Sequence, residues 1–166
     1  MSVQVFIGIG SNQGDRLGNC RAAVEQLRLL PETGVVHVSP FFGSEPQEGV
    51  EGGMFLNGVV EICTDLSPRC LLSRLQEIEV ALGRPRDHQP ATGRSMDLDI
   101  LLYGESVVEE PGLSIPHPRM VRRGFVLAPL AAVAPAARHP ILQLTAAELL
   151  RRLGPEPPTS AREVGQ

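Results

Sequence analysis

The order of the secondary-structure patterns is the feature that most constrains the fold of this chain. Over residues 2–103, segments with the two-residue period of a strand and segments with the spacing of a helix follow the order βαββαβ. The predicted strands cover 3–9, 35–42, 55–63 and 96–103, and the predicted helices cover 15–30 and 67–82. This order predicts an α+β fold of the ferredoxin-like type, an antiparallel sheet with both helices on one face.

The residues after 103 predict a helical extension of the same domain. Short helices are expected near 124–133 and at 145–153, and the Pro-rich tail 156–166 is expected to be frayed. We therefore interpret 1–166 as a single domain, with a plait core over 2–103 and an extension over 104–155. No apolar run approaches the roughly 18–20 residues that span a bilayer, so we expect a cytoplasmic protein without membrane contact.

The charge balance narrows the chemistry that is available. The net charge of −4 argues against a general affinity for nucleic acid. Lysine is absent, and all fifteen basic residues are arginines. This excludes a P-loop lysine, a Schiff-base lysine and the lysine of protein kinases. Anion chemistry would have to use arginine, a metal ion and backbone amides.

Two acidic residues lie in the last predicted strand, in the segment MDLDILLYG. Because side chains alternate across a strand, Asp97 and Asp99 should share one face, while Leu98, Ile100 and Leu102 should share the other. Solvated acids on an edge strand are the alternative, but two acids on one face of an apolar strand repel each other unless a cation neutralises them. The pattern therefore predicts that Asp97 and Asp99 bind Mg²⁺.

Arginines flank this strand in the sequence. Three lie in the loop before it and three follow His117: Arg84, Arg86 and Arg94, then Arg119, Arg122 and Arg123. Guanidinium groups bind phosphate oxygens through paired N–H donors. Many phosphoryl-transfer enzymes combine arginine with carboxylate-bound Mg²⁺ to stabilise the transferred group. A single exposed arginine on a loop can have no functional role, but three on one loop beside an acidic pair favour a role in phosphate binding.

Several other residues allow more than one interpretation. His117 lies between two prolines, and a structural role and a phosphate contact fit it equally well. Glu79 falls beside the apolar stripe of the second helix, where a solvated charge is the default interpretation. The three cysteines have apolar neighbours and no metal-ligand spacing, so we expect small reduced core residues: Cys20, Cys63 and Cys70. The glycines of IGIGSNQG depart from the dinucleotide-binding pattern.

Taken together, these segments resemble the 6-hydroxymethyl-7,8-dihydropterin pyrophosphokinases of folate biosynthesis. The matching segments are IGIGSNQGDR, FLNGVVEI, IEVALGR, GRSMDLDILLYG and IPHPRMVRRGFVLAPLAAVAP, in family order over most of residues 3–135. One departure lies in the loop before the acidic strand, which reads Ala91-Thr92-Gly93-Arg94 where the family usually has Trp-Gly-Pro-Arg.

The resemblance implies an activity and a set of site residues. The β,γ-diphosphate of ATP would pass to the pterin hydroxymethyl group and release AMP, with two Mg²⁺ ions on Asp97 and Asp99. Loop arginines matching Arg84 and Arg94 would close over the phosphates. The implied pterin contacts are Ser44, Glu45, Pro46, Phe55, Asn57 and Phe125. The implied ATP contacts are Gln76, Glu79, Arg86, Ile100, Ser114, His117 and Arg123.

Two alternatives stay open from the residues. The first is a non-catalytic plait-fold module that binds a ligand, and the second is a pyrophosphokinase that acts on a different hydroxymethyl heterocycle. The loops 43–54 and 84–95 are rich in glycine and proline, and their composition suits segments that close over a site. We expect small-molecule substrates only, and a monomer, as the family mostly is.

Overall fold

A computed structural model of the chain, described over residues 2–44, 55–83, 96–154 and 162–163, confirms the α+β plait. The elements of the plait are β1 Val3–Ser11, α1 Arg16–Arg28, β2 Thr33–Val38, β3 Phe42–Ser44, β4 Phe55–Thr64, α2 Pro68–Ala81 and β5 Asp97–Tyr103. The strands run β5-β1-β4-β3 across the sheet, β2 also pairs with β4, and every pairing is antiparallel.

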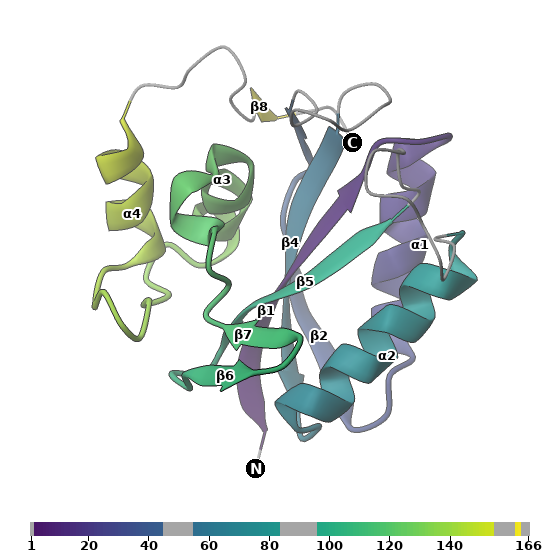
Figure 1. Ribbon diagram of the computed structural model, residues 1–166. Helices are drawn as coiled ribbons and strands as arrows, with labels where there is room; N and C mark the ends of the chain where they lie inside the picture. The colour runs from purple at the N-terminus through teal and green to yellow at the C-terminus, as the bar shows by residue number, and fades with distance from the viewer. Residues whose placement is uncertain (1, 45–54, 84–95, 155–161, 164–166) are drawn as a thin grey trace.

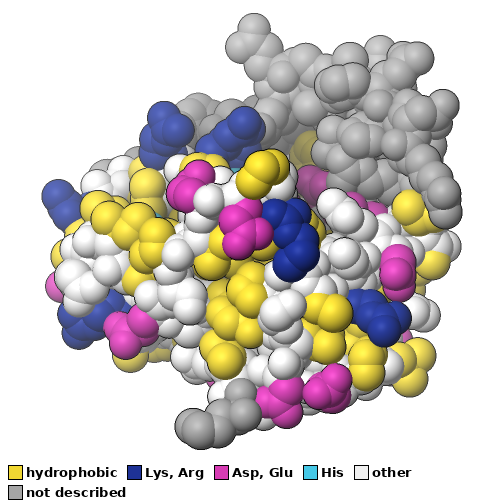
Figure 2. Space-filling view, turned by 60° about the horizontal axis from the view of Figure 1, so that its bottom comes forward, with side chains coloured by type: hydrophobic (Ala, Val, Ile, Leu, Met, Phe, Trp, Pro, Cys, Tyr) yellow, Lys and Arg dark blue, Asp and Glu magenta, His cyan; other side chains and the backbone are white. Residues whose placement is uncertain are grey.

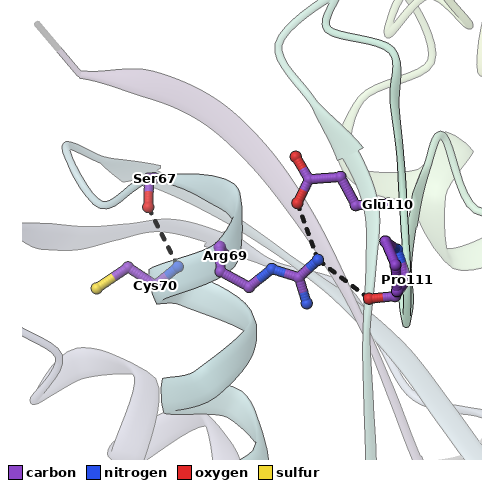
Figure 3. A network of polar contacts seen from close by, with 5 residues as sticks. All are labelled: Ser67, Arg69, Cys70, Glu110 and Pro111. Carbon is purple, nitrogen blue, oxygen red and sulfur yellow. Dashed lines mark hydrogen bonds and ion pairs between the residues drawn. The ribbon is translucent and has the colours of Figure 1, made fainter.

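Both plait helices begin where the sequence places a capping side chain. The carboxylate of Asp15 accepts a hydrogen bond from the Gly18 N–H at 3.0 Å. At the second helix, the Ser67 hydroxyl accepts from the Cys70 N–H at 3.2 Å (Figure 3). Pro68 occupies the first turn of this helix. Each cap satisfies a backbone donor that the first helical turn cannot pair, which is why both helices start at these positions.

One face of the sheet packs against α1 and α2 over its whole length. The apolar residues of β1 that alternate with its glycines pack in this core against the apolar faces of the two helices. The core includes Val5, Ile7, Ile9, Leu27, Leu71, Leu75, Leu98 and Ile100. Cys20 lies fully buried here, and this burial raises the pKa of its thiol to about 12. The prediction of core cysteines is wrong for Cys70, which is exposed because helical spacing turns it away from the buried stripe.

The C-terminal extension covers part of the opposite face. Its helices α3 Gly124–Val133 and α4 Ala146–Leu153 lie on the side of the sheet away from α1 and α2 (Figure 1). A second core joins them to the sheet and includes Phe6, Val59, Leu101, Leu102, Leu127, Leu130 and Leu149. The sheet is therefore the middle of three layers. In the described parts of the chain, no helix has the length and apolarity to cross a membrane.

A hairpin that the sequence did not predict connects β5 to the extension. Its strands are β6 Val108–Glu110 and β7 Leu113–Ile115, and a 3-10 turn, Met120–Arg122, follows it. The Arg69 guanidinium on α2 donates to the Glu110 carboxylate at 2.8 Å and to the Pro111 carbonyl at 3.0 Å, tying the hairpin to α2 (Figure 3). On this side of the molecule, acidic and basic side chains are scattered among apolar ones (Figure 2).

Two predicted boundaries are corrected by backbone pairing. The strand predicted over 35–42 is split into β2 and β3. Pro40 has no N–H to donate to a neighbouring strand, and at the break the Ser39 hydroxyl, in place of a backbone carbonyl, accepts from the Val59 N–H at 2.9 Å. The tail predicted to be frayed contains a two-residue strand, β8 Arg162–Glu163, which pairs with β3. Backbone hydrogen bonds of β3 hold these two residues against the sheet.

Candidate active site

A cavity of about 490 Å³ lies on the α3 side of the sheet. Its floor is made of β1, β4 and β5, and its wall is the segment from His117 to α3. The lining residues are Gly8, Ile9, Gly10, Ser44, Phe55, Asn57, Gly58, Asp97, Asp99, Leu101, His117, Pro118, Arg119, Arg123, Phe125 and Val126. The cavity exists because β1 carries Phe6 under α3 and then only glycine at the next two positions on that face, Gly8 and Gly10.

A bulge in β5 separates the acidic pair from the apolar end of the strand. Phe6 pairs with Leu102 and Ile7 with Ile100, so Leu101 is an extra residue that faces no partner on β1. Asp97 and Asp99 face the cavity as predicted, opposite Gly10 and Gly8. The prediction that Leu102 shares a face with Leu98 and Ile100 is wrong, because the bulge turns Leu102 into the second core.

The same bulge anchors His117. The Leu101 carbonyl accepts from the His117 N–H at 2.9 Å, and the His117 Nδ1 accepts from the Arg119 N–H at 3.2 Å. Because Nδ1 accepts, the ring proton lies on Nε2, which is 3.9 Å from the Asp99 Oδ2. Burial, reinforced by Arg123 and Arg119 and opposed by Asp97, lowers the pKa of His117 to about 4. The imidazole is therefore neutral at pH 7, and its Nε2–H points toward the acidic pair.

The other end of the cavity is lined by aromatic and amide groups. The buried Asn57 donates from Nδ2 to the Ser44 hydroxyl at 2.7 Å, which fixes the orientation of its amide. Phe55 and Phe125 line the cavity from β4 and α3, and both rings are partly exposed. The Arg123 guanidinium stacks over the Phe125 ring, 5.4 Å from its centroid. An apolar surface with an oriented amide at its edge can bind a flat heterocycle.

The structure brings eight of the predicted site residues together in this cavity: Ser44, Phe55, Asn57, Asp97, Asp99, His117, Arg123 and Phe125. Five predicted residues lie outside the described part of the chain: Glu45, Pro46, Arg84, Arg86 and Arg94. Four others are described but do not line the cavity: Gln76, Glu79, Ile100 and Ser114. The predicted set is thus assembled in part.

The four residues outside the cavity lie on β5 or on the elements that flank it. Glu79 on α2 is buried, and its carboxylate accepts from the Leu98 N–H of β5 at 2.7 Å. The default interpretation of a solvated charge is therefore wrong, because the edge strand offers Glu79 a backbone donor. Gln76 is exposed on α2, Ser114 is half-buried on β7, and the Ile100 side chain is buried in the first core.

The acidic pair has the donor set that Mg²⁺ uses. Asp97 and Asp99 are both half-buried and project from one face of β5 into the cavity. Among the described residues, no group of three or more histidine, cysteine, aspartate or glutamate side chains could hold a metal ion. Mg²⁺ commonly binds through one or two carboxylates and completes its shell with water and substrate phosphates. Two carboxylates in an open cavity fit that mode.

The residues that give the cavity its space were not predicted from the sequence. Gly8 and Gly10 form part of the floor, and a Cβ at Gly10 would lie 3.3 Å from the Asn57 Oδ1. The signal was present in the alternation of β1, where apolar side chains fill one face and glycines empty the other. Of the three arginines after His117, the cavity is lined by Arg119 and Arg123 and not by Arg122.

Comparisons with known proteins agree with this geometry. Residues 6–135 match the family described as 7,8-dihydro-6-hydroxymethylpterin-pyrophosphokinase (HPPK). The chain is 42% identical over 140 residues to a 2-amino-4-hydroxy-6-hydroxymethyldihydropteridine pyrophosphokinase of Pseudomonas aeruginosa, covering 84% of this chain and 86% of that one. Its identity to the protein of the same name from Bacillus subtilis is 43% over 128 residues, covering 77% and 76%.

A solved structure shares the fold. The wild-type HPPK-DHPS of Plasmodium falciparum superposes with a TM-score of 0.68 at 13% identity, over 92% of this chain and 45% of that chain. This chain therefore spans less than half of that longer protein, and the likeness concerns the fold alone. The match over residues 6–135 and the two bacterial relatives show that the chain belongs to the 7,8-dihydro-6-hydroxymethylpterin-pyrophosphokinase family.

Proposed function

We propose that this chain transfers the β,γ-diphosphate of ATP to the hydroxymethyl group of 6-hydroxymethyl-7,8-dihydropterin and releases AMP. The hydroxymethyl oxygen forms a bond to the β-phosphorus, and the bond from that phosphorus to the α,β-bridging oxygen breaks. AMP leaves with the electron pair, and the hydroxyl loses its proton. The observation that carries this proposal is that one cavity joins an acidic pair at one end to aromatic and amide groups at the other.

The aromatic end of the cavity suits the pterin. Phe55 and Phe125 offer apolar faces for a flat ring, and Asn57 offers oriented amide groups for its polar edge. Ser44 holds the Asn57 amide by accepting one of its two N–H donors, so the Asn57 side chain is already oriented before the ring enters. Such orientation reduces the entropy lost on binding. We propose that Glu45 and Pro46, which follow β3 in the sequence and lie outside the described residues, also contact the ring.

The acidic end suits the phosphates. Asp97 and Asp99 would hold two Mg²⁺ ions, which supply charge neutralisation to the triphosphate and lower the pKa of the attacking hydroxyl. The neutral His117 can donate from Nε2 to a phosphate oxygen, and Arg123 can donate to another while its stacking on Phe125 holds it beside the ring. The weak alcohol nucleophile would thus be positioned in line with the phosphate.

The remaining nucleotide contacts are proposed from the family resemblance. Residues around β5 would bind the rest of ATP: Gln76, Glu79, Ile100 and Ser114. Residues of the loop 84–95 would bind and cover the phosphates: Arg84, Arg86 and Arg94. We also propose that the protein acts as a cytoplasmic monomer. ATP is a substrate found in that compartment, and the monomer is proposed from the family resemblance.

The test is to incubate the protein with ATP, Mg²⁺ and the reduced pterin and to quantify the nucleotides by anion-exchange chromatography. AMP should appear in equal amount to the pterin diphosphate. ADP in place of AMP would mean transfer of a single phosphoryl group, which would contradict the proposal. Binding of ATP and pterin without any AMP would favour a non-catalytic module, and AMP formed only with another hydroxymethyl heterocycle would identify a different acceptor.

A further inference from the structure

Arg119 is a cavity residue without an assigned ligand contact, although it belongs to the arginines that follow His117. It lies between β7 and α3, on the turn that begins at His117, and its side chain lines the cavity beside Arg123. Among the described residues, no hydrogen bond or ion pair forms with its guanidinium; its backbone N–H donates to the Nδ1 of His117, and its backbone carbonyl accepts from the Arg122 N–H. A cation at the edge of a cavity that has no side-chain partner in the described part of the chain can bind an anionic ligand.

The turn holds Arg119 at a fixed position. The His117 N–H is bound to the Leu101 carbonyl, the Met120 N–H donates to the His117 carbonyl at 3.3 Å, and the Arg122 N–H donates to the Arg119 carbonyl at 3.2 Å. Met120 is fully buried in the second core. These contacts fix the backbone on both sides of Arg119, so only its side chain has to be ordered when a ligand binds.

The surroundings of Arg119 favour an anion. Burial lowers the pKa of Arg123, and repulsion by Arg119 lowers it further, so the two guanidinium groups are close enough to interact. Two cations that face one cavity repel each other until an anion lies between them. Asp97 and Asp99 attract Arg123, but these carboxylates are also the proposed ligands of Mg²⁺. With metal bound there, both arginines would be available to a phosphate.

We propose that the Arg119 guanidinium binds the diphosphate that is being transferred, as a second cation beside Arg123. Guanidinium groups bind phosphate oxygens through two parallel N–H donors, and this geometry suits a group that moves from ATP to the pterin during the reaction. Arg119 would contact the same diphosphate before transfer, as part of ATP, and afterwards, as part of the pterin product. This inference rests on the proposed function, since it assigns a further contact within the same site.

The experiment compares Arg119→Gln with Arg122→Gln by isothermal titration calorimetry in the presence of Mg²⁺. Arg122 is the matched control, because it is exposed on the same turn and does not line the cavity. The ligands are α,β-methylene-ATP, whose α–β link cannot be cleaved, inorganic diphosphate and AMP. Arg119→Gln should weaken the first two about tenfold, which corresponds to about 1.4 kcal/mol, and AMP by less than about threefold.

The outcomes separate the two proposals. Arg119→Lys should recover part of the lost affinity, because it restores the charge without the planar pair of donors. Equal affinities in Arg119→Gln and Arg122→Gln, or an equal loss for AMP and for the diphosphate ligands, would overturn the assignment. These titrations need no turnover, so they remain interpretable if the wild-type protein forms no AMP and the proposed function fails. Unchanged urea unfolding of both variants would exclude a folding defect.

Discussion

The two faces of the sheet show how one set of strands serves both stability and chemistry. The face toward α1 and α2 is mostly apolar, and β1 contributes Val5, Ile7 and Ile9 to its core, followed by the buried Ser11 beside Asn19 of α1. On the face toward α3 and α4, β1 offers Phe6 to the core and then Gly8 and Gly10 to the cavity. The first face can only pack, whereas the second packs at one end and leaves space at the other.

The difference between the two faces explains where the polar groups of the cavity are. β4 contributes Val59 to the second core but Asn57 and Phe55 to the cavity, and β5 contributes Leu101 and Leu102 to that core but Asp97 and Asp99 to the cavity. On this face, β1, β4 and β5 all change from core residues to cavity residues at nearly the same position across the sheet. Substitutions on the α1/α2 face should therefore change stability, and substitutions in the cavity should change activity.

The largest effect is expected from the acidic pair. Asp97→Asn or Asp99→Asn removes a charge that should hold Mg²⁺. The rate of AMP formation should therefore fall by about 10³-fold or more, because the transition state loses a major source of electrostatic stabilisation. The fold should survive, because both side chains are only half-buried. Steady-state rates and urea unfolding check this, with Glu109→Gln on the exposed hairpin as the control. Near-normal rates in both variants would show that the metal lies elsewhere.

A substitution in the α1/α2 core should lower stability and leave turnover unchanged, the opposite of the result expected for the acidic pair. Leu71 is fully buried in the α1/α2 core, so Leu71→Ala should lower the free energy of unfolding by about 2–5 kcal/mol. The turnover number of the molecules that remain folded should stay close to the wild-type value. Val80→Ala on the same helix is the control, because Val80 is 42% exposed and should cost little. A Leu71→Ala variant with unchanged stability but low turnover would show that the α1/α2 face contributes to catalysis and not only to stability.

The emptied half of the cavity face can be tested by filling it. A Cβ at Gly10 would lie 3.3 Å from the Asn57 Oδ1 and 3.8 Å from the Phe55 ring, so Gly10→Val should obstruct the pterin end. We expect the KM for the pterin to rise about tenfold or more, on the scale of a few lost contacts. Gly34→Val is the control, since a Cβ there meets nothing within 4 Å. A pterin KM that does not change in Gly10→Val would mean that the ring binds elsewhere.

The smallest effect concerns the helix that closes the second core. Backbone and side-chain hydrogen bonds with Thr145 lower the pKa of Glu148, in a capping box at the start of α4. A carboxyl whose pKa is lowered by folding stabilises the fold above its unfolded pKa, and that contribution is lost as the pH falls through the folded value. Urea unfolding between pH 7 and pH 3 should show less acid sensitivity in Glu148→Gln than in the wild type. An identical pH dependence would show that the cap does not contribute.

Much of this arrangement could be predicted from local patterns. The βαββαβ order gave the sheet and the positions of α1 and α2, and strand alternation gave a common face for Asp97 and Asp99. These predictions succeed because the period of side chains along a strand or helix is a local property. The bulge at Leu101 is not local, since it arises where β5 pairs with β1, and it reversed the predicted orientation of Leu102.

Other features depended on contacts between distant segments. The burial of Glu79 requires the free Leu98 N–H of the edge strand, and the break at Ser39 requires the Val59 N–H of β4. The neutral His117 with its proton on Nε2 depends on the turn that brings the Arg119 N–H to Nδ1. None of these pairings has a signal in the sequence near the residue concerned. The family resemblance predicted an ATP contact for His117 without indicating this geometry.

The most direct test of the proposed site is a crystal structure of the protein with Mg²⁺, α,β-methylene-ATP and 6-hydroxymethylpterin. We expect the pterin between Phe55 and Phe125 with its edge at Asn57, and Mg²⁺ bound by Asp97 and Asp99 between the ring and the nucleotide. A metal ion away from this acidic pair would contradict it. So would a pterin bound on the α1 side of the sheet, in the groove lined by Val24 and Phe41.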